Sequence, residues 1–298
     1  MKSVPTVIEA VKMSEGYLSR HGVESARLSA EHLLAKALGC TRLDLYLRFE
    51  ERLADTVLEE YRGDLKKRAG RMPLQYIIGG VQFRALDLAV RSDIFIPRPE
   101  TELLVDLAAE LMAGRQSVRF IEFGTGTGAI SAALAAENPG WTGTAFDVNP
   151  EAVSLADENC GSLGLSGRVD LLVADGFEIF EENGSYDLAV SNPPYIPSGD
   201  IEALQEEVSS WESRAALDGG REGLDFYPPI AAGAFRLLRP GGAVALEIGD
   251  GQGEAVSRIL DGAGFGNTEI RRDYNGLERM VSGRRPEGPG EGDGGTAS

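Results

Sequence analysis

Between residues 118 and 248 the chain alternates short apolar segments with helical ones, and this alternation constrains its fold more than any other feature. The apolar and β-branched segments are typical of strands and cover residues 118–123, 141–146, 169–173, 188–191 and 243–248. Helical segments at 129–136, 150–160 and 230–238 lie between them, and residues 239–242 supply a turn that ends the last one. We therefore predict an α/β fold with a doubly wound, mostly parallel sheet, which binds ligands at the carboxyl ends of its strands.

The first 72 residues carry a different pattern. Apolar residues recur at helical spacing from Ala30 to Leu38, where Gly39 can end the helix, and again from Leu53 to Leu65. We predict a small helical bundle for residues 1–72 and a β-hairpin linker for residues 73–97, where Gly79-Gly80 interrupts short β-type runs. Residues 98–284 form the predicted α/β domain, and the Gly-, Pro- and Glu-rich residues 285–298 form a predicted disordered tail.

Length and composition are those of an ordinary globular protein. The 298 residues exceed a common domain of roughly 100–200 residues, and 42% are hydrophobic. No segment reaches the roughly 20 apolar residues of a membrane span, and the start lacks the apolar core of a signal peptide, so we expect a cytoplasmic protein. The two cysteines, Cys40 and Cys160, lie far apart in the sequence, so we predict neither a disulfide nor a zinc site. The two histidines, His21 and His32, both lie in the N-terminal region, so we predict no histidine-based triad or metal site.

The net charge of −18 is unevenly distributed along the chain. Residues 1–80 carry 13 basic against 11 acidic side chains, whereas residues 81–298 carry 16 against 36. An acidic field repels a polyanion such as DNA and fits a basic protein partner better. The dense basic run Lys66-Lys67-Arg68, with Arg71 nearby, is typical of a solvated helix face.

A glycine-rich turn, Gly124-Thr125-Gly126-Thr127-Gly128, follows the first predicted strand and opens a helix. Glycines let the backbone turn tightly and approach a ligand, although a tight structural turn is the simpler alternative. Nineteen residues after Gly128, Asp147 ends the next strand, where its two carboxylate oxygens can accept both hydroxyl hydrogens of a ribose. The Gly-x-Gly-x-Gly spacing differs from that of pyrophosphate-binding turns and favours S-adenosylmethionine over NAD.

Four further positions are candidates for contacts with this cofactor. Asp175 follows the third strand and can accept a hydrogen bond from the adenine amino group, with Gly176 and Phe177 beside it. The alternative for Asp175 is the N-cap of a helix. Glu122 ends the first strand, where a carboxylate would favour a sulfonium or ammonium group.

The segment Asn192-Pro193-Pro194-Tyr195 follows the fourth strand at the same predicted edge. Its prolines lack N–H groups and fix φ, so carbonyl groups face the site. The Asn192 side-chain oxygen and the Pro193 carbonyl can each accept one N–H of a planar NH₂ group and hold its nitrogen toward a methyl donor. Tyr195 can pack over that group and favour the sulfonium. We predict that Asn192, Pro193 and Tyr195 are catalytic and that all four residues bind substrate, although Asn-Pro alone is also a common rigid turn.

Together with other segments, these motifs make residues 5–283 resemble the release-factor glutamine methyltransferases, the family called HemK or PrmC. The resemblance rests on residues 96–102 (Ile-Pro-Arg-Pro-Glu-Thr-Glu), 124–128, 192–196, 216–220 with 223–224, and 272–274. It implies an N-terminal helical domain and a Rossmann-like class I S-adenosylmethionine-dependent methyltransferase domain. It also implies methylation of the side-chain nitrogen N5 of the glutamine in the Gly-Gly-Gln motif of class-I peptide-chain release factors.

By the same resemblance, Gly124 to Gly128, Asp147 and Asn192 contact the cofactor, and Asn192 to Tyr195 contact the substrate glutamine. The chain departs from the family pattern at two places. Gly176 stands where many members carry an aromatic residue, so adenine stacking would fall to Phe177. Ser213 stands where the family has proline after glutamate, which predicts a less rigid loop between Tyr195 and Gly219.

Two other functions fit parts of the pattern. An adenine-N6 nucleic-acid methyltransferase could use the same Asn-Pro-Pro-Tyr segment, but the acidic charge and the absence of an added basic domain disfavour it. A binding protein without catalysis is disfavoured by the intact Asn192. We expect a monomer without metal ion, nucleic acid or membrane contact that acts on release factors. A tripeptide buries too little surface for specificity, so we expect the helical domain, including Lys66 to Arg71, to dock the substrate.

Overall fold

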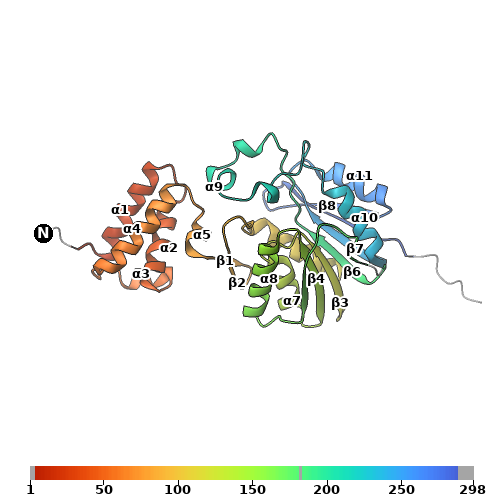
Figure 1. Cartoon of the computed structure of the whole chain (residues 1–298), viewed down its shortest axis with the longest axis horizontal. Coiled ribbons are helices and arrows are strands. Elements are labelled where there is room, and N and C mark those ends of the chain that lie inside the picture. The colour runs from red at the N-terminus through yellow and green to blue at the C-terminus, as the bar shows by residue number, and fades with distance from the viewer. Residues whose placement is uncertain (1–3, 181–182, 288–298) are drawn as a thin grey trace, which may run out of the picture. The chain divides into compact units, whose positions relative to one another are not determined.

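The computed structural model describes residues 4–180 and 183–287, and the chain divides into two compact units (Figure 1). The first, called here the helical unit, comprises Met1–Gly80, Val90–Asp93 and Leu204–Glu212. The second, the sheet unit, comprises Val81–Ala89, Ile94–Ala203 and Ser213–Ser298. Most of the predicted tail, residues 288–298, lies outside the described residues.

The helical unit follows the predicted bundle closely. Its helices in the described part of the chain are α1 (Val7–Arg20), α2 (Ala26–Leu38), α3 (Arg42–Leu47), α4 (Asp55–Ala69), α5 (Leu74–Ile78) and α9 (Glu206–Ser209). A capping box of Thr6 and Glu9 starts α1, and Gly39 ends α2 with φ +62°. Leu33 and Leu34 are fully buried among the other apolar residues of this bundle. Helix α5 corrects the linker prediction, because residues 74–78 are helical and the hairpin begins only at Gly80.

The sheet unit contains, within the described residues, a seven-stranded sheet of order β5-β4-β3-β6-β7-β9-β8. Its strands are β3 (Val118–Phe123), β4 (Trp141–Asp147), β5 (Val169–Val173), β6 (Tyr186–Ser191), β7 (Leu238–Glu247), β8 (Gly266–Arg272) and β9 (Glu278–Arg284). The first five in this order are parallel, and β9 runs antiparallel to both β7 and β8. This confirms the predicted doubly wound, mostly parallel α/β fold.

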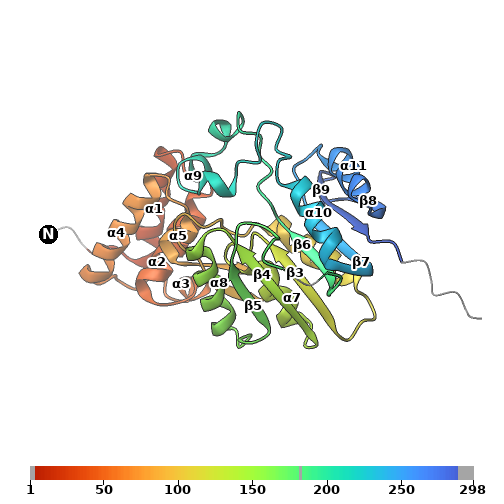
Figure 2. The ribbon, with the colours of Figure 1, turned by 45° about the vertical axis from the view of Figure 1, so that its right-hand side comes forward.

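Helices cover both faces of this sheet (Figure 2). Val118 and Phe120 of β3 join the core under α6 (Glu102–Leu111), α7 (Ala129–Glu137) and α8 (Pro150–Ser162). Ile121 and Phe123 point to the other face, toward α10 (Tyr227–Leu237) and α11 (Gly253–Ala263). The remaining elements of this unit are the hairpin β1 (Gly80–Phe83) and β2 (Leu86–Ala89), and the short helices η1 (Pro99–Thr101), η2 (Ile201–Ala203) and η3 (Arg214–Ala216).

The carboxyl-terminal part of the sheet differs from the prediction at one turn. Residues 239–242 were expected to form a turn after the helix, but they belong to β7. Gly241 donates its backbone N–H to the Arg285 carbonyl, and Arg285 donates its own to the Gly242 carbonyl. Arg285 was assigned to the tail, yet these bonds make it part of the sheet unit. Among the described residues, no helix has both the length and the apolar character that crossing a membrane requires.

Candidate active site

The predicted glycine-rich turn lies between β3 and α7, at the carboxyl edge of the sheet. The backbone N–H groups of Gly124 and Thr125 both donate to the carbonyl of Phe146 in β4, over 2.9 and 3.1 Å. Gly128 has φ +79°, and a Cβ atom there would lie 2.9 Å from the Ala156 Cβ atom. Only glycine therefore permits both this backbone conformation and this approach of α8 to the turn.

Glu122 is buried beneath this turn. Its Oε2 atom accepts hydrogen bonds from the backbone N–H of Ser131, from the Ser131 hydroxyl and from the Thr125 hydroxyl. Burial raises the pKa of Glu122 to about 8, although these hydrogen bonds oppose the shift. The structure thus gives Glu122 a role in bracing the turn against α7. Its contact with a cationic cofactor stays a prediction.

Asp147 lies at the end of β4, next to the same turn. One carboxylate oxygen accepts the backbone N–H of Gly126 at 3.0 Å, and the other accepts that of Asn149 at 2.9 Å. The carboxylate is half-buried, and each oxygen can accept a further hydrogen bond. Its position is therefore compatible with the predicted ribose contact.

The segment after β5 excludes one of the two alternatives considered for Asp175, the helix N-cap, and leaves the adenine contact a prediction. Asp175 is exposed, and the described residues after it form bends and a turn, so the helix N-cap interpretation is wrong. Gly176 has φ +117°, a conformation that an aromatic residue would adopt only under strain. The Phe177 ring packs edge-on against Phe123 at 4.6 Å between centroids. This core packing does not support a stacking role for Phe177 on adenine.

Asn192 follows β6 directly beside the glycine-rich turn. Ser191 pairs with Phe123 in the parallel register of β6 and β3, so the next residues, Asn192 and Gly124, leave the sheet side by side. The Ser191 hydroxyl also donates to the Phe123 carbonyl at 2.7 Å. The Asn192 side-chain nitrogen donates to the Thr101 hydroxyl oxygen at 3.1 Å. The two predicted halves of the site thus meet at one edge of the sheet.

A glycine loop supports the backbone of the Asn-Pro-Pro-Tyr segment. Ile196 pairs with Asp218, and its backbone N–H donates to the carbonyl of Leu217 at 3.1 Å. A Cβ atom on Gly219 would lie 2.7 Å from the Pro194 carbonyl oxygen, and one on Gly223 would overlap the Tyr195 carbonyl oxygen. Both positions must therefore be glycine if the loop is to pack this closely.

Tyr195 and Glu247 meet on the inner side of this segment. The Tyr195 hydroxyl lies 3.5 Å from Glu247 Oε1, at the long limit of a hydrogen bond. Glu247 ends β7, is 2% exposed, and its Oε2 atom has no hydrogen-bond partner among the described residues. Burial raises the pKa of Glu247 to about 7, and burial also raises that of Tyr195. Gln252 fixes the segment further, because its side-chain nitrogen donates to the Tyr195 carbonyl at 2.9 Å.

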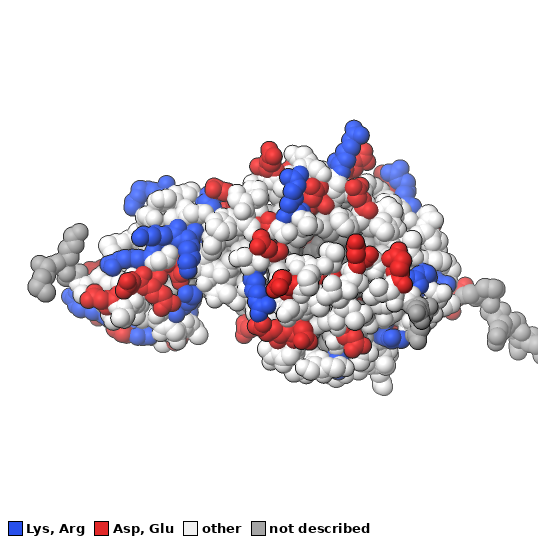
Figure 3. Space-filling view, viewed as in Figure 1, with Lys and Arg blue, Asp and Glu red and all other residues white. Residues whose placement is uncertain are grey.

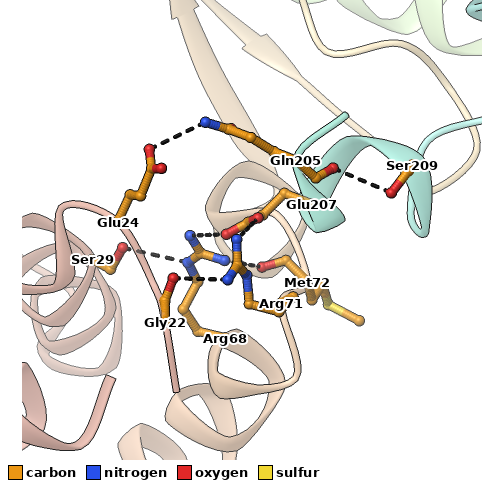
Figure 4. A network of polar contacts seen from close by, with 9 residues as sticks. All are labelled: Gly22, Glu24, Ser29, Arg68, Arg71, Met72, Gln205, Glu207 and Ser209. Carbon is orange, nitrogen blue, oxygen red and sulfur yellow. Dashed lines mark hydrogen bonds and ion pairs between the residues drawn. The ribbon is translucent and has the colours of Figure 1, made fainter. Parts of the chain in front are cut away.

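The basic run of the helical unit is used inside that unit. Figure 4 shows Arg68 and Arg71 converging on the carboxylate of Glu207, which lies in α9. Arg68 is 6% exposed and also donates to the Met72 carbonyl at 3.1 Å. The predicted solvated face is therefore wrong for Arg68 and Arg71, because Glu207 draws both guanidinium groups inward. Lys66 and Lys67 remain exposed, as predicted.

Charged side chains lie on the surfaces of both units. Figure 3 shows acidic and basic side chains interspersed on the visible faces of both the sheet unit and the helical unit. Within the described ranges no group of three or more His, Cys, Asp or Glu side chains is arranged to hold a metal ion.

Known proteins resemble this chain over most of its length. The family model described as the PrmC N-terminal domain matches residues 9–79, and the methyltransferase small domain matches residues 100–212. A release factor glutamine methyltransferase of Geobacter sulfurreducens is 41% identical over 279 residues, which cover 94% of this chain and 96% of that protein. The chain belongs to the release factor glutamine methyltransferase family.

Further comparisons agree with this family membership. Another release factor glutamine methyltransferase, from Moorella thermoacetica, is 40% identical over 283 residues, covering 95% of this chain and 99% of that protein. The solved structure of a methyltransferase from Pyrococcus furiosus has a TM-score of 0.52 at 19% identity, and covers 74% of this chain and 99% of that one. That structure supports the class I methyltransferase fold of the sheet unit and no more.

Three of the segments that carried the resemblance, residues 96–102, 192–196 and 216–224, contact one another in the structure. Thr101, from the segment 96–102, contacts Asn192, and Gly219 and Gly223 pack under Pro194 and Tyr195. No individual role was predicted from the sequence for Thr101, Gly219 or Gly223.

Thr101, Glu247 and Gln252 were not predicted as site residues from the sequence. The signal for Thr101 was its place in a quoted motif, and that for Glu247 was its place at the carboxyl end of a predicted strand. Gln252 gave no comparable signal, because its contact with Tyr195 spans 57 residues.

Proposed function

We propose that this protein transfers the methyl group of S-adenosylmethionine to the side-chain nitrogen N5 of the glutamine in the Gly-Gly-Gln motif of class-I release factors. The geometry of Asn192 carries this proposal. Its Nδ2 atom donates to Thr101, which leaves Oδ1 to accept an N–H of a substrate NH₂ group beside the glycine-rich turn. The names of relatives that are 41% and 40% identical support glutamine as the group that carries this NH₂.

The residues at the turn fit S-adenosylmethionine. Gly124 and Gly126 have φ +71° and +53°, and a Cβ atom on either would meet no other atom within 4 Å, so open space lies over the turn. When bound there, the cofactor would supply a methyl group carried on a sulfonium. We assign the turn from Gly124 to Gly128, Asp147 for the ribose, Asp175 for the adenine amino group, and Asn192 to this site.

The chemistry needs positioning more than it needs a strong base. A carboxamide nitrogen is a weak nucleophile, because its lone pair is delocalised into the carbonyl group. Asn192 Oδ1 and the Pro193 carbonyl each accept one N–H, which fixes the nitrogen and stabilises the positive charge that develops on it. The N–C bond forms as the C–S bond breaks, and the nitrogen releases one proton to solvent. Neither Pro193 nor Pro194 can donate a competing N–H.

Mass spectrometry of the methylated product tests this proposal. Protein and isotope-labelled S-adenosylmethionine are incubated with a class-I release factor, with the same factor carrying glutamate in place of the Gly-Gly-Gln glutamine, and with DNA or RNA. We expect one added methyl group on the intact factor alone. Label on nucleic acid and none on the factor would establish the adenine-N6 alternative instead.

Two substitutions separate the two halves of the site. Asn192→Ala is expected to abolish methyl transfer while cofactor binding is largely retained. Asp147→Ala is expected to weaken cofactor binding by about 1–3 kcal/mol, the cost of a lost hydrogen bond to a charged group. Calorimetric titration with S-adenosylmethionine measures the second effect. Unchanged turnover in the Asn192 variant would refute the assigned mechanism.

We also propose that the enzyme is a monomer, needs no metal ion, and uses its helical unit to dock the release factor. Arg68 and Arg71 are engaged with Glu207, so the exposed basic side chains of this run are Lys66 and Lys67, and Lys67 is itself paired with Asp64 at 2.8 Å. Replacing both lysines with glutamate should raise KM for the intact factor without changing kcat. Activity should persist in a metal chelator, and light scattering should give the mass of one chain.

A further inference from the structure

Thr101 is the hydrogen-bond partner of the Asn192 side-chain amide. It ends η1, is 3% exposed, and its hydroxyl oxygen accepts the hydrogen bond from Asn192 Nδ2 at 3.1 Å. An asparagine amide can be turned so that either its oxygen or its nitrogen faces a given partner. The proposed reaction requires the oxygen on the substrate side, because the substrate also presents an NH₂ group. Any group that keeps Asn192 Nδ2 directed at Thr101 therefore also keeps Oδ1 directed at the substrate, as the reaction requires.

Glu247 lies opposite Asn192 across two adjacent strands. Ser191 pairs with Leu246 in the parallel register of β6 and β7, and the next residues are Asn192 and Glu247. Glu247 Oε2 is buried with no hydrogen-bond partner among the described residues, although a buried carboxylate oxygen without a donor is costly. The Thr101 hydroxyl is close enough to lower the pKa of Glu247. A donor and an unsatisfied acceptor thus lie together behind Asn192.

The donors and acceptors of Asn192, Thr101 and Glu247 determine the direction of the hydrogen bonds that connect them. An ionised carboxylate can only accept, and a hydroxyl has one hydrogen and two lone pairs. If the Thr101 hydrogen is directed at Glu247, the Thr101 oxygen can only accept from Asn192, and this requires Asn192 Nδ2. Asn192 Oδ1 then faces the substrate.

We propose that Thr101 and Glu247 are positioning residues, which together hold the Asn192 amide with Oδ1 toward the substrate NH₂ group. This inference rests on the proposed role of Asn192 as a hydrogen-bond acceptor. It assigns a function to the 96–102 segment, which supplies Thr101. It also explains why an acidic group stands behind an asparagine that needs no base.

The charged state of Glu247 depends on groups from several elements. Burial raises its pKa to about 7, the charge of Glu100 acts in the same direction, and Arg279 of β9 together with the Thr101 and Tyr195 hydroxyls opposes the shift. Tyr227 of α10 donates to the Glu247 backbone carbonyl at 3.1 Å. Below pH 7 the protonated carboxyl of Glu247 can itself donate to Thr101. The hydrogen bonds from Asn192 to Thr101 and from Thr101 to Glu247 then no longer have a fixed direction. The rate of methyl transfer should therefore fall as the pH falls through about 7.

Single-turnover methyl transfer with saturating S-adenosylmethionine tests the proposal in the full-length enzyme. Thr101→Val keeps the shape of the side chain and removes the hydroxyl, and it should lower the rate by about 10- to 100-fold, the range expected for a misaligned reacting group. Thr101→Ser keeps the hydroxyl and should restore the rate to within about threefold of wild type. Thr144→Val is the matched control, because Thr144 is also a buried threonine, whose hydroxyl accepts from Tyr186 away from the site.

Glu247→Gln supplies the second readout. A glutamine can donate as well as accept, so the rate should fall by about tenfold at pH 8, and the decline between pH 8 and pH 6 should be smaller than in wild type. Glu122 titrates in the same range, since burial raises its pKa to about 8, and the difference between the two pH profiles removes its contribution. Calorimetric binding of S-adenosylmethionine gives the folded fraction of each variant.

Each result has a definite consequence. A wild-type rate in Thr101→Val, or equal losses in Thr101→Val and Thr101→Ser, would overturn the positioning role. Loss in Glu247→Gln with no loss in Thr101→Val would make Glu247 a direct partner of the substrate instead. An active Asn192→Ala variant would overturn the proposed function as well, whereas an inactive one beside an active Thr101→Val would overturn this inference alone.

Discussion

Glu207 of the helical unit and Glu247 of the sheet unit are both largely buried carboxylates, but their surroundings are opposite. Glu207 binds two guanidinium groups, those of Arg68 and Arg71. Although burial works against it, these hydrogen bonds lower the pKa of Glu207. Glu247 has one long contact to Tyr195 and an oxygen without a partner, and burial raises its pKa to about 7.

This difference separates a structural carboxylate from a functional one. A buried charge that is paired on both oxygens contributes to holding chain segments together, and it has no capacity left for a reaction. An unpaired buried carboxylate costs stability, and such groups concentrate at functional sites. Glu207 attaches residues 204–212 to the bundle, and Glu247 stands behind Asn192. The two residues should therefore respond oppositely to mutation and to pH.

The largest expected effect is on stability, from Glu207→Gln. Removing one partner of a buried ion pair leaves the arginines uncompensated and should lower the free energy of unfolding of the helical unit by about 3–5 kcal/mol. Urea titration read by hydrogen–deuterium exchange in peptides from residues 7–70 measures this loss. Glu206→Gln, at the exposed neighbouring position, is the control and should change it by less than about 0.5 kcal/mol. Equal effects of the two substitutions would remove the structural role of Glu207.

The pH dependence of that loss sharpens the contrast. The folded-state pKa of Glu207 is lower than its ordinary value of 4.5, so its contribution is present above pH 4.5 and is lost as the pH falls through the folded-state pKa. The difference between wild type and Glu207→Gln should therefore shrink in acid. A difference that stayed constant down to pH 3 would mean that packing, and not charge, is what the substitution removes.

The next largest expected effect is a gain in the free energy of unfolding, from Glu247→Gln. The folded-state pKa of about 7 exceeds the ordinary 4.5, so the native state binds the proton more tightly and wild-type stability falls as the pH rises from 4.5 to 7. Glutamine removes this cost. The variant should match wild type near pH 4 and exceed it by about 3 kcal/mol at pH 8, by the conversion of 1.36 kcal/mol per pKa unit.

Thermal unfolding of the sheet unit at the two pH values measures the effect of Glu247→Gln. The residual slope of the variant belongs to Glu122, whose raised pKa of about 8 acts in the same direction. If Glu247→Gln proved less stable than wild type at pH 8, Glu247 would be stabilised by its surroundings in the way Glu207 is. The comparison between the two residues would then fail.

The sequence predicted the local elements well and the long-range contacts poorly. Strands β3 and β5 begin and end at the predicted residues, because their apolar runs are bounded by turn signals. Strands β8 and β9 were not predicted, and β8 has no buried residue that would mark its apolar face. The glycine-rich turn, Asp147 and Asn192 were found because each directly follows a recognisable strand.

The contacts that were not predicted from the sequence, in the helical unit and in the site, join residues that are far apart in the chain. Arg68 and Glu207 are 139 residues apart, and no local pattern distinguishes a paired arginine in a basic run from a solvated one. Thr101 and Asn192 are 91 residues apart, and their contact exists only because the segment before α6 returns to the end of β6. Motifs therefore identified which segments matter, and topology decided which side chains meet.

The smallest expected effect concerns Ser213, directly after the segment that Glu207 attaches. Ser213 has φ −61°, within the range that proline fixes, and η3 begins at the next residue. The backbone is thus already shaped for a proline, the residue that the resemblance led us to expect here. Ser213→Pro should stabilise the chain by about 0.4–1 kcal/mol, because it restricts the unfolded state. A matched change at Ser210, where φ is −101°, should destabilise it, and thermal unfolding of both variants checks the pair. A lower melting temperature in Ser213→Pro would mean that the backbone at Ser213 needs conformations that proline forbids. The segment 204–212 would then not be held rigidly by Glu207.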